Sequence, residues 1–147
     1  MKYALFALLA LVVALASFIS FRYFYDDKIS EVEINGVSVT AEIVDTPELR
    51  MQGLSGRDSL DKDKGMLFVF DEPGRYGFYM RDMNFAIDII WMDEDFEVVD
   101  IVEDLRPDTY PEVFEPDRPA LFVLEVVSGF VEENDILIGT QADISNL

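Results

Sequence analysis

The sequence predicts a mainly β protein: a compact β-sandwich, jelly-roll-like or barrel domain with one or two short helices, preceded by a single N-terminal transmembrane helix. Residues 3–21 carry no charge and are long enough to cross a hydrocarbon layer of about 30 Å. Short runs rich in β-branched and aromatic residues then recur between turn residues, which is typical of an all-β domain. Long amphipathic helical patterns are absent, which disfavours a parallel α/β fold.

We interpret residues 1–25 as a signal anchor. Lys2 precedes the apolar run, Arg22 follows it, and four of residues 21–25 are aromatic, as in an interfacial belt. The alternative is a signal peptide cleaved near Ala16, because Ala14-Leu15-Ala16 has the small-x-small pattern. We favour the uncleaved anchor because the apolar run continues past Ala16. Both interpretations place the bulk of the chain outside the cytoplasm, either membrane-anchored or, after cleavage, secreted.

Residues 26–34 are expected to form a juxtamembrane segment and the first strand, and residues 35–147 the rest of the β domain. Asn35-Gly36 lies between apolar runs at 32–34 and 37–44, which predicts a hairpin with a type I′ turn. Thr46 and Pro47 then predict a helix start. This short helix covers 47–52 and ends at Gly53.

The remaining pattern brings the expected total to about eight short strands. The expected strands beyond the hairpin cover 65–70, 77–81, 86–92, 96–102, 121–127 and 136–138. Four prolines within 106–119 predict an irregular loop, and residues 128–133 predict one or two helical turns.

The composition excludes several classes of protein. The chain has 30 Asp and Glu against 11 Lys and Arg, a net charge of −19, and this acidity argues against binding to nucleic acid. Without Cys or His there are no disulfides, no zinc sites on those ligands and no Ser-His-Asp triad. No glycine-rich phosphate motif is present, and the acids of 61–65 and 93–95 lack EF-hand spacing. We therefore expect no cofactor and no resident metal. The acidity indicates either adaptation to salt or repulsion from anionic lipid.

Five phrases of the sequence, taken in order, resemble one family. They are Gly-Leu-Ser-Gly-Arg at 53–57, Gly-Met-Leu-Phe-Val-Phe at 65–70, Phe-Tyr-Met-Arg-Asp-Met at 78–83, Asp-Ile-Ile-Trp-Met-Asp at 88–93 and Leu-Glu-Val-Val-Ser-Gly-Phe at 124–130. Over about residues 35–144 the chain resembles the domain of unknown function family 192 (DUF192), also catalogued as an uncharacterised protein family. The resemblance implies a mainly β domain of jelly-roll or sandwich type that often follows a signal peptide or membrane anchor, and it implies no established activity.

Two positions depart from the pattern of that family. The family has Phe-Trp-Met-Lys where this chain has Phe-Tyr-Met-Arg at 78–81, and it often has Asn where this chain has Val127. The first departure keeps an aromatic and a basic side chain. The second removes any role of an amide at that position.

Six residues are candidates for a ligand-binding site: Arg57, Tyr79, Arg81, Asp82, Asp88 and Glu125. The two arginines would orient an anionic or polar group of the ligand. Tyr79 would stack on it, with Trp91 as a second aromatic platform. The carboxylates Asp88 and Glu125, each within an apolar strand, would hold the arginines.

The sequence favours a non-catalytic module that binds a small molecule, glycan or polypeptide. One alternative is a hydrolase that uses Asp88 and Glu125 as acid and base. A second alternative is a purely structural envelope module whose acidic surface is its functional trait. The expected partners are the membrane, through residues 3–21, and the bound ligand.

Overall fold

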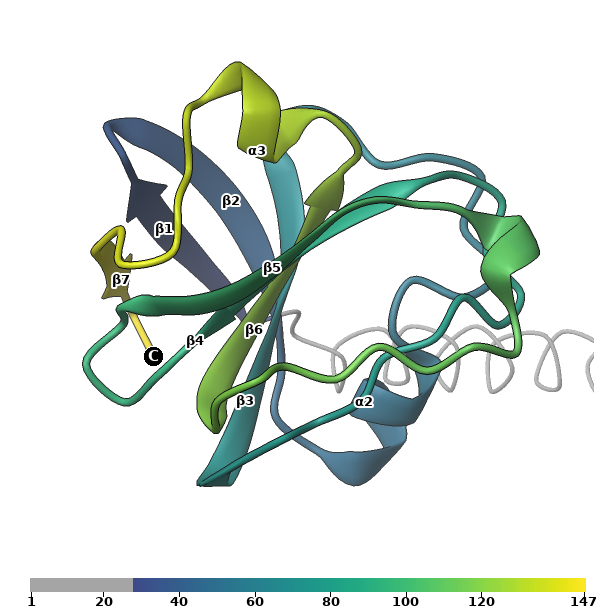
Figure 1. Cartoon of the computed structure of the whole chain (residues 1–147), viewed down its shortest axis with the longest axis horizontal. Helices are drawn as coiled ribbons and strands as arrows, with labels where there is room; N and C mark the ends of the chain where they lie inside the picture. The colour runs from purple at the N-terminus through teal and green to yellow at the C-terminus, as the bar shows by residue number, and fades with distance from the viewer. Residues whose placement is uncertain (1–27) are drawn as a thin grey trace, which may run out of the picture.

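The computed structural model describes residues 28–147, which form a curled β-sheet with short helices at its margins (Figure 1). The predicted transmembrane segment at 3–21 lies outside the described residues. Within residues 28–147 no helix is long and apolar enough to span a bilayer.

The predicted mainly β fold with short helices is confirmed. The elements, in chain order, are β1 (Ile29–Ile34), β2 (Val37–Val44), α2 (Pro47–Gln52), β3 (Lys64–Gly74), β4 (Ile87–Met92), β5 (Val98–Leu105), the 3-10 turn η1 (Pro107–Thr109), β6 (Ala120–Val127), α3 (Phe130–Glu133) and β7 (Ala142–Ser145). The strands form one seven-stranded sheet in the order β5-β4-β6-β3-β2-β1-β7. A single sheet means that the domain is a half-barrel rather than a sandwich of two sheets.

The first hairpin and the helix that follows it agree with their sequence predictions. Asn35 and Gly36 have φ values of 48° and 79°, as both central residues of a type I′ turn require, and they join β1 to β2. Thr46 accepts a hydrogen bond from the Leu49 backbone N–H at 3.3 Å, Pro47 occupies the first turn of α2, and the helix ends at Gly53.

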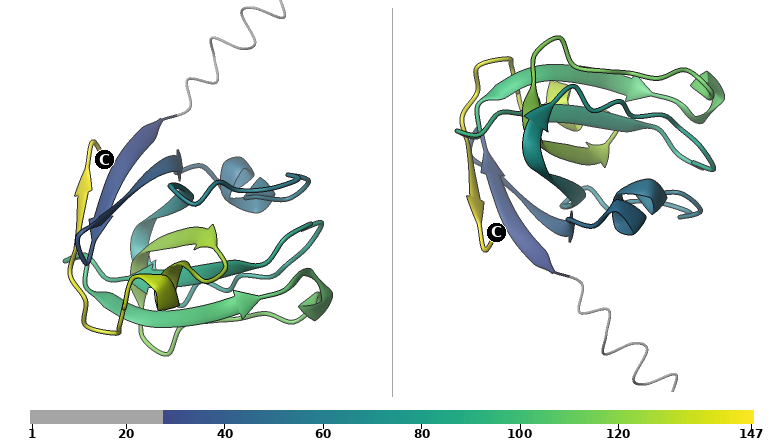
Figure 2. Two further views of the ribbon diagram at one scale, coloured as in Figure 1. Left: turned by 90° about the horizontal axis from the view of Figure 1, so that it is seen from above. Right: turned by 90° about the horizontal axis from the view of Figure 1, so that it is seen from below.

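The curl of the sheet brings its two edges close together at one end. β2 and β3 pair in parallel, which requires the crossover that contains α2, and the other neighbouring strands are antiparallel. Beside the start of β5, Val98 donates a backbone hydrogen bond to the Thr140 carbonyl at 2.9 Å, and Gly139 donates to the Val98 carbonyl at 2.8 Å. The segment that leads into β7 therefore lies against β5, and Figure 2 shows this end of the sheet from above and below.

Apolar cores lie on both faces of the sheet. The first core draws buried side chains from all seven strands, so the curl encloses it. The second core lies on the opposite face of the central strands and is covered by α2 and by residues 76–85. Trp91 and Phe68 are its largest fully buried side chains. The covering of this second core contains the candidate site.

Two predicted strands are wrong. Residues 77–81 form an extended segment in which only Phe78 pairs, through an isolated bridge to Phe114. The last strand is β7 at 142–145 rather than 136–138, where Leu137 and Ile138 are exposed in a loop. Both segments have the apolar composition that is typical of a strand, but their backbones do not pair in a ladder.

Candidate functional site

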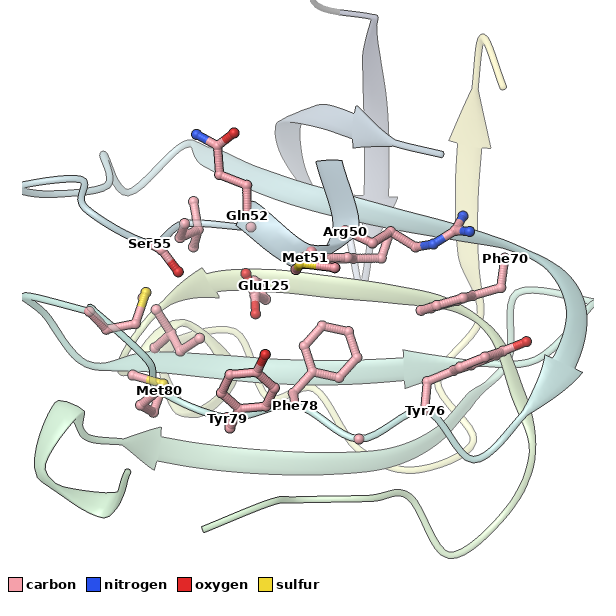
Figure 3. Close-up of a pocket in the computed structure, with 16 residues that line it drawn as sticks. Arg50, Met51, Gln52, Ser55, Phe70, Tyr76, Phe78, Tyr79, Met80 and Glu125 are labelled. Carbon is pink, nitrogen blue, oxygen red and sulfur yellow. The ribbon is translucent and has the colours of Figure 1, made fainter. Parts of the chain in front are cut away.

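A cavity of about 170 Å³ lies on the second core, between α2 and the extended segment 76–80 (Figure 3). β3 and β6 contribute the side chains behind it. Most of the lining is aromatic, aliphatic or thioether in character. The lining residues are Arg50, Met51, Gln52, Gly53, Leu54, Ser55, Phe68, Phe70, Tyr76, Gly77, Phe78, Tyr79, Met80, Met83, Ile87 and Glu125.

Hydrogen bonds join the two segments that face each other across the cavity. The Ser55 hydroxyl donates to the Arg81 carbonyl at 2.9 Å, and the Gly56 N–H donates to the Asp82 carbonyl at 2.8 Å. Arg81 Nη2 in turn donates to the Met51 carbonyl at 3.2 Å. These contacts fix the turn after α2 against residues 79–83, so hydrogen bonds to backbone carbonyls hold the mouth of the cavity.

One wall is a stack of Arg50, Phe70 and Tyr76. Arg50 Nη1 donates to the carbonyls of Asp45 and Val69 at 2.9 and 2.7 Å, and its guanidinium lies 5.1 Å from the centre of the Phe70 ring. Phe70 and Tyr76 stack with ring centres 3.5 Å apart and planes 5° from parallel. The guanidinium is therefore held against this wall and away from a ligand.

Glu125 is the buried acid of the cavity. The β6 register places it on the same row as Met66 of β3 and Ile89 of β4, and Met66 continues the row to Glu42 of β2. The Glu125 residue is 7% exposed, and its Oε2 atom has no hydrogen-bond partner among the described residues. Figure 3 shows its carboxyl between the side chains of α2 and those of Phe78 and Tyr79.

The environment of Glu125 strongly disfavours its charged form. Burial raises the pKa of this carboxyl from 4.5 to about 8, and the nearby Arg57 charge opposes the rise. The carboxyl is thus mostly protonated at neutral pH when the cavity holds no ligand. An acid with a raised pKa in a concave apolar site is a marker of functional sites.

Arg57 lies beside this acid and is paired with Glu42. Its Nη1 and Nη2 atoms donate to the two Glu42 carboxylate oxygens at 2.6 Å each, in the bidentate geometry typical of arginine. These hydrogen bonds hold the pKa of the Glu42 carboxyl below its ordinary value, against the effect of partial burial. The bidentate partner of Arg57 is therefore Glu42, and not Asp88 or Glu125 as the sequence suggested.

Among the other predicted residues, Tyr79 also lines the cavity. It is 42% exposed at the mouth, and the Arg81 guanidinium lies 5.7 Å from the centre of its ring. Arg81 and Asp82 lie behind this mouth, where they contribute the backbone carbonyls described above. Five of the six predicted residues thus belong to one region, although only Tyr79 and Glu125 line the cavity itself. Asp88 is the exception.

The predicted role of Asp88 is wrong. In the ladder between β4 and β6, Asp88 is opposite Val126 while Ile89 is opposite Glu125, so the two carboxyls point to opposite faces of the sheet. Asp88 is fully buried and accepts backbone hydrogen bonds from Asp104 at 2.9 Å and Val131 at 3.0 Å. Asp88 therefore holds the end of β5 and the start of α3.

Trp91 does not form a platform for a ligand either. The side chain is fully buried in the second core, and its Nε1 donates to the Tyr76 carbonyl at 3.2 Å. It packs edge-on against Phe78, with ring centres 5.9 Å apart. Trp91 therefore supports the wall of the cavity from behind.

Sequence reasoning missed most of the apolar lining. Met51 of α2 is 65% exposed, and the Arg50–Phe70–Tyr76 stack joins residues far apart in the sequence. One available signal was the apolar Met51 on a helix too short to bury a full face. Tyr76 reaches Phe70 because the end of β3 is irregular, with a shift of register against β6 between Val69 and Gly74.

The fold and this site define a half-barrel β domain with a cavity on its second core. The chain belongs to the DUF192 family: the family model, described as "Uncharacterized ACR", matches residues 30–144. No curated protein matches the chain.

Two crystal structures are similar to the chain. A proposed transcription regulator from Sinorhizobium meliloti 1021 has a TM-score of 0.75 and 24% sequence identity, covering 81% of this chain and 95% of that one. A protein of unknown function from Novosphingobium aromaticivorans DSM 12444 has a TM-score of 0.73 and 28% identity, covering 78% of this chain and 84% of that one. These similarities establish the fold. The function has to be inferred from the site.

Proposed function

We propose that this protein is a membrane-anchored, extracytoplasmic and non-catalytic module that binds a small molecule in the cavity above Glu125. Residues 3–21 form the anchor, and cleavage near Ala16 would instead release the same module as a secreted protein. The ligand site belongs to the β domain, and the anchor determines where that domain is presented.

One observation carries the proposal: the buried Glu125 Oε2 lacks a hydrogen-bond partner among the described residues, and the residue lines a cavity. A buried polar atom without a partner costs roughly 1–3 kcal/mol, and more when the group is charged. A packing role alone would be served as well by leucine or methionine. A ligand that donates a hydrogen bond to this oxygen removes that cost, which makes the acid useful to a binding site.

The size of the cavity favours a small ligand. An apolar cavity of roughly 150 Å³ is sufficient to hold benzene, and the volume here is about 170 Å³. One ring, or a short chain of similar size, fits the enclosed part. A glycan or a polypeptide would have to leave most of its surface outside.

The positions of Asp88 and Glu125 argue against the hydrolase alternative. The glycosidase type of acid–base mechanism uses two carboxyl groups on one cleft, and Asp88 and Glu125 point to opposite faces of the sheet. Glu125 is the only carboxyl among the described residues that line the cavity. A single protonated carboxyl without a second acid supports binding better than hydrolysis.

The proposal is tested with the full-length chain, labelled with ¹³C at its methionine methyl groups and held in detergent micelles. Met51, Met80 and Met83 line the cavity, whereas Met92 is buried in the first core on the other face of the sheet. A panel of small amines, alcohols, carboxylates and sugars is titrated in turn. We expect at least one compound to shift the three cavity methyls in a saturable manner while the Met92 signal stays unchanged. If no compound does so, the cavity is not a ligand site.

A further inference from the structure

We infer that the ligand is a small organic cation, in which a primary ammonium group is carried on an apolar ring or short chain. The ammonium group would donate to Glu125 Oε2, and the apolar body would lie among the aromatic and thioether side chains. This inference rests on the proposed function, because it specifies the ligand of the same cavity.

Among the polar side chains of the lining, Glu125 is the buried acceptor, whereas Tyr79 is 42% exposed at the mouth. The Tyr76 hydroxyl donates to the Glu72 carbonyl, and the Ser55 hydroxyl donates to the Arg81 carbonyl. The Gln52 amide points away from the cavity (Figure 3). A ligand that enters the enclosed part therefore meets a carboxyl oxygen that needs a donor.

The nearby arginines are engaged elsewhere, which argues against the anionic ligand that the sequence suggested. Arg57 uses both terminal nitrogens on the Glu42 carboxylate, and Arg50 is held by two carbonyls and the face of Phe70. Arg81 donates to a backbone carbonyl at the mouth. An anionic ligand would have to displace one of these contacts.

An ionised Glu125 would be a buried charge without a direct cationic partner. Arg57 is paired with Glu42 and Arg50 is held against the Phe70 ring, so neither guanidinium donates to Glu125 Oε2. Without a ligand, the carboxyl avoids this charge by keeping its proton. A bound ammonium group supplies the missing positive charge and a hydrogen-bond donor at the same atom.

The aromatic lining suits the same ligand class. The faces of aromatic rings attract cations, and the rings of Phe78 and Tyr79 line the same cavity as Glu125. The net charge of −19 further raises the local concentration of cations around the protein.

Binding of an ammonium group is coupled to loss of the Glu125 proton. The cation stabilises the ionised carboxyl, so it lowers the pKa of Glu125 and releases a proton on binding. Other titratable or charged groups around the cavity are Glu42 of β2, Arg57 of the turn, Arg50 of α2 and the tyrosines of the extended segment. We assign the pH dependence of binding between neutrality and pH 8 to Glu125.

The test uses three probes of one shape on the full-length chain in detergent micelles: benzylamine, benzyl alcohol and benzoate. Their dissociation constants are measured calorimetrically, with heats from micelles alone subtracted. We expect benzylamine to bind most tightly, with its affinity falling by up to about tenfold for each pH unit below 8. A calorimetric proton release that depends on the buffer should accompany it. The lysine side chain of a polypeptide carries the same ammonium group as a free amine. The dissociation constant of Nα-acetyl-lysine is therefore compared with that of benzylamine to distinguish these two sources.

Two matched variants complete the test. Glu125→Gln keeps the shape but cannot ionise, so benzylamine affinity should fall at least tenfold and its pH dependence should vanish. Glu48→Gln removes the same charge from α2 outside the cavity lining, and benzylamine binding should stay within about twofold.

The outcomes separate the inference from the proposed function. If benzoate or benzyl alcohol binds more tightly than benzylamine, or if benzylamine binding does not strengthen as the pH rises, the cation inference is wrong while the ligand site stands. If none of the probes binds and the methionine methyls respond to nothing in the larger panel, the proposed function fails as well.

Discussion

The most specific consequence of the structure concerns stability and pH. Glu125 has a pKa of about 8 in the folded chain against an ordinary value of 4.5. At about 1.4 kcal/mol for each pKa unit, this difference corresponds to roughly 5 kcal/mol. Small domains have a total stability of roughly 5–15 kcal/mol, so this one carboxyl has a large effect.

The direction of the effect follows from proton linkage. Between about pH 4.5 and 8 the folded chain keeps the Glu125 proton and the unfolded chain has lost it, so the folded chain binds more protons. The contribution of Glu125 is therefore most favourable below about pH 4.5 and is lost as the pH rises through 8. A salt-bridged acid such as Glu42 has the opposite effect. Its pKa is lowered in the folded chain, so it adds stability at pH values above its ordinary pKa.

Urea unfolding of the full-length chain in detergent measures this effect through the variant Glu125→Gln. The variant cannot ionise at this position, so subtracting its curve removes the contribution of the other acids. Relative to the variant, the native chain should lose about 1.4 kcal/mol of unfolding free energy for each pH unit between about 5 and 8. Near pH 5 the two chains should differ by no more than about 2 kcal/mol.

A surface acid provides the control for this measurement. Glu94→Gln removes one charge from an exposed turn, and its stability should stay within about 0.5 kcal/mol of the native value. If the difference between the native chain and Glu125→Gln does not change between pH 5 and 8, then Glu125 is ionised in the folded chain. The reasoning about its burial would then be refuted.

Three other substitutions test the surrounding structure. Asp88→Ala leaves two backbone donors unsatisfied and should cost roughly 2–5 kcal/mol in urea unfolding, with ligand shifts at the cavity methionines retained. Arg57→Met removes the charge that opposes the pKa rise of Glu125, so the pH-dependent loss of stability should extend to a higher pH in the same unfolding series. Gly65→Ala places a Cβ atom 3.0 Å from the Glu125 carbonyl oxygen and should cost roughly 1–3 kcal/mol, measured by thermal unfolding.

Local signals explain the parts of the fold that could be predicted. Asn35-Gly36 requires positive φ at both residues, and Thr46-Pro47 combines a cap with a fixed φ, so the hairpin and α2 follow from a few neighbouring residues. The segment 77–81 failed because its partner is the single bridge to Phe114, about 35 residues away. The order of residues within 77–81 does not indicate a pairing with a residue so far away in the sequence.

The sequence predicted which kinds of side chain form the site, but it did not predict which of them lie together. An acid within an apolar strand, such as Glu125 or Asp88, is recognisable from the sequence as a group that needs a partner. Which face each acid occupies depends on the register between β4 and β6, and a shift of one residue would exchange them. The pairing of Arg57 with Glu42 likewise follows from the crossover that returns β3 beside β2.

The central claim is that Glu125 holds a proton in the free protein and releases it to solvent when an ammonium group binds. The most direct measurement follows the side-chain carboxyl ¹³C signal of Glu125 against pH in the full-length chain, without ligand and with saturating benzylamine. We predict a midpoint near 8 in the free protein and a clearly lower midpoint in the complex. A free-protein midpoint near the ordinary value of 4.5, or a midpoint that benzylamine leaves unchanged, would contradict the claim.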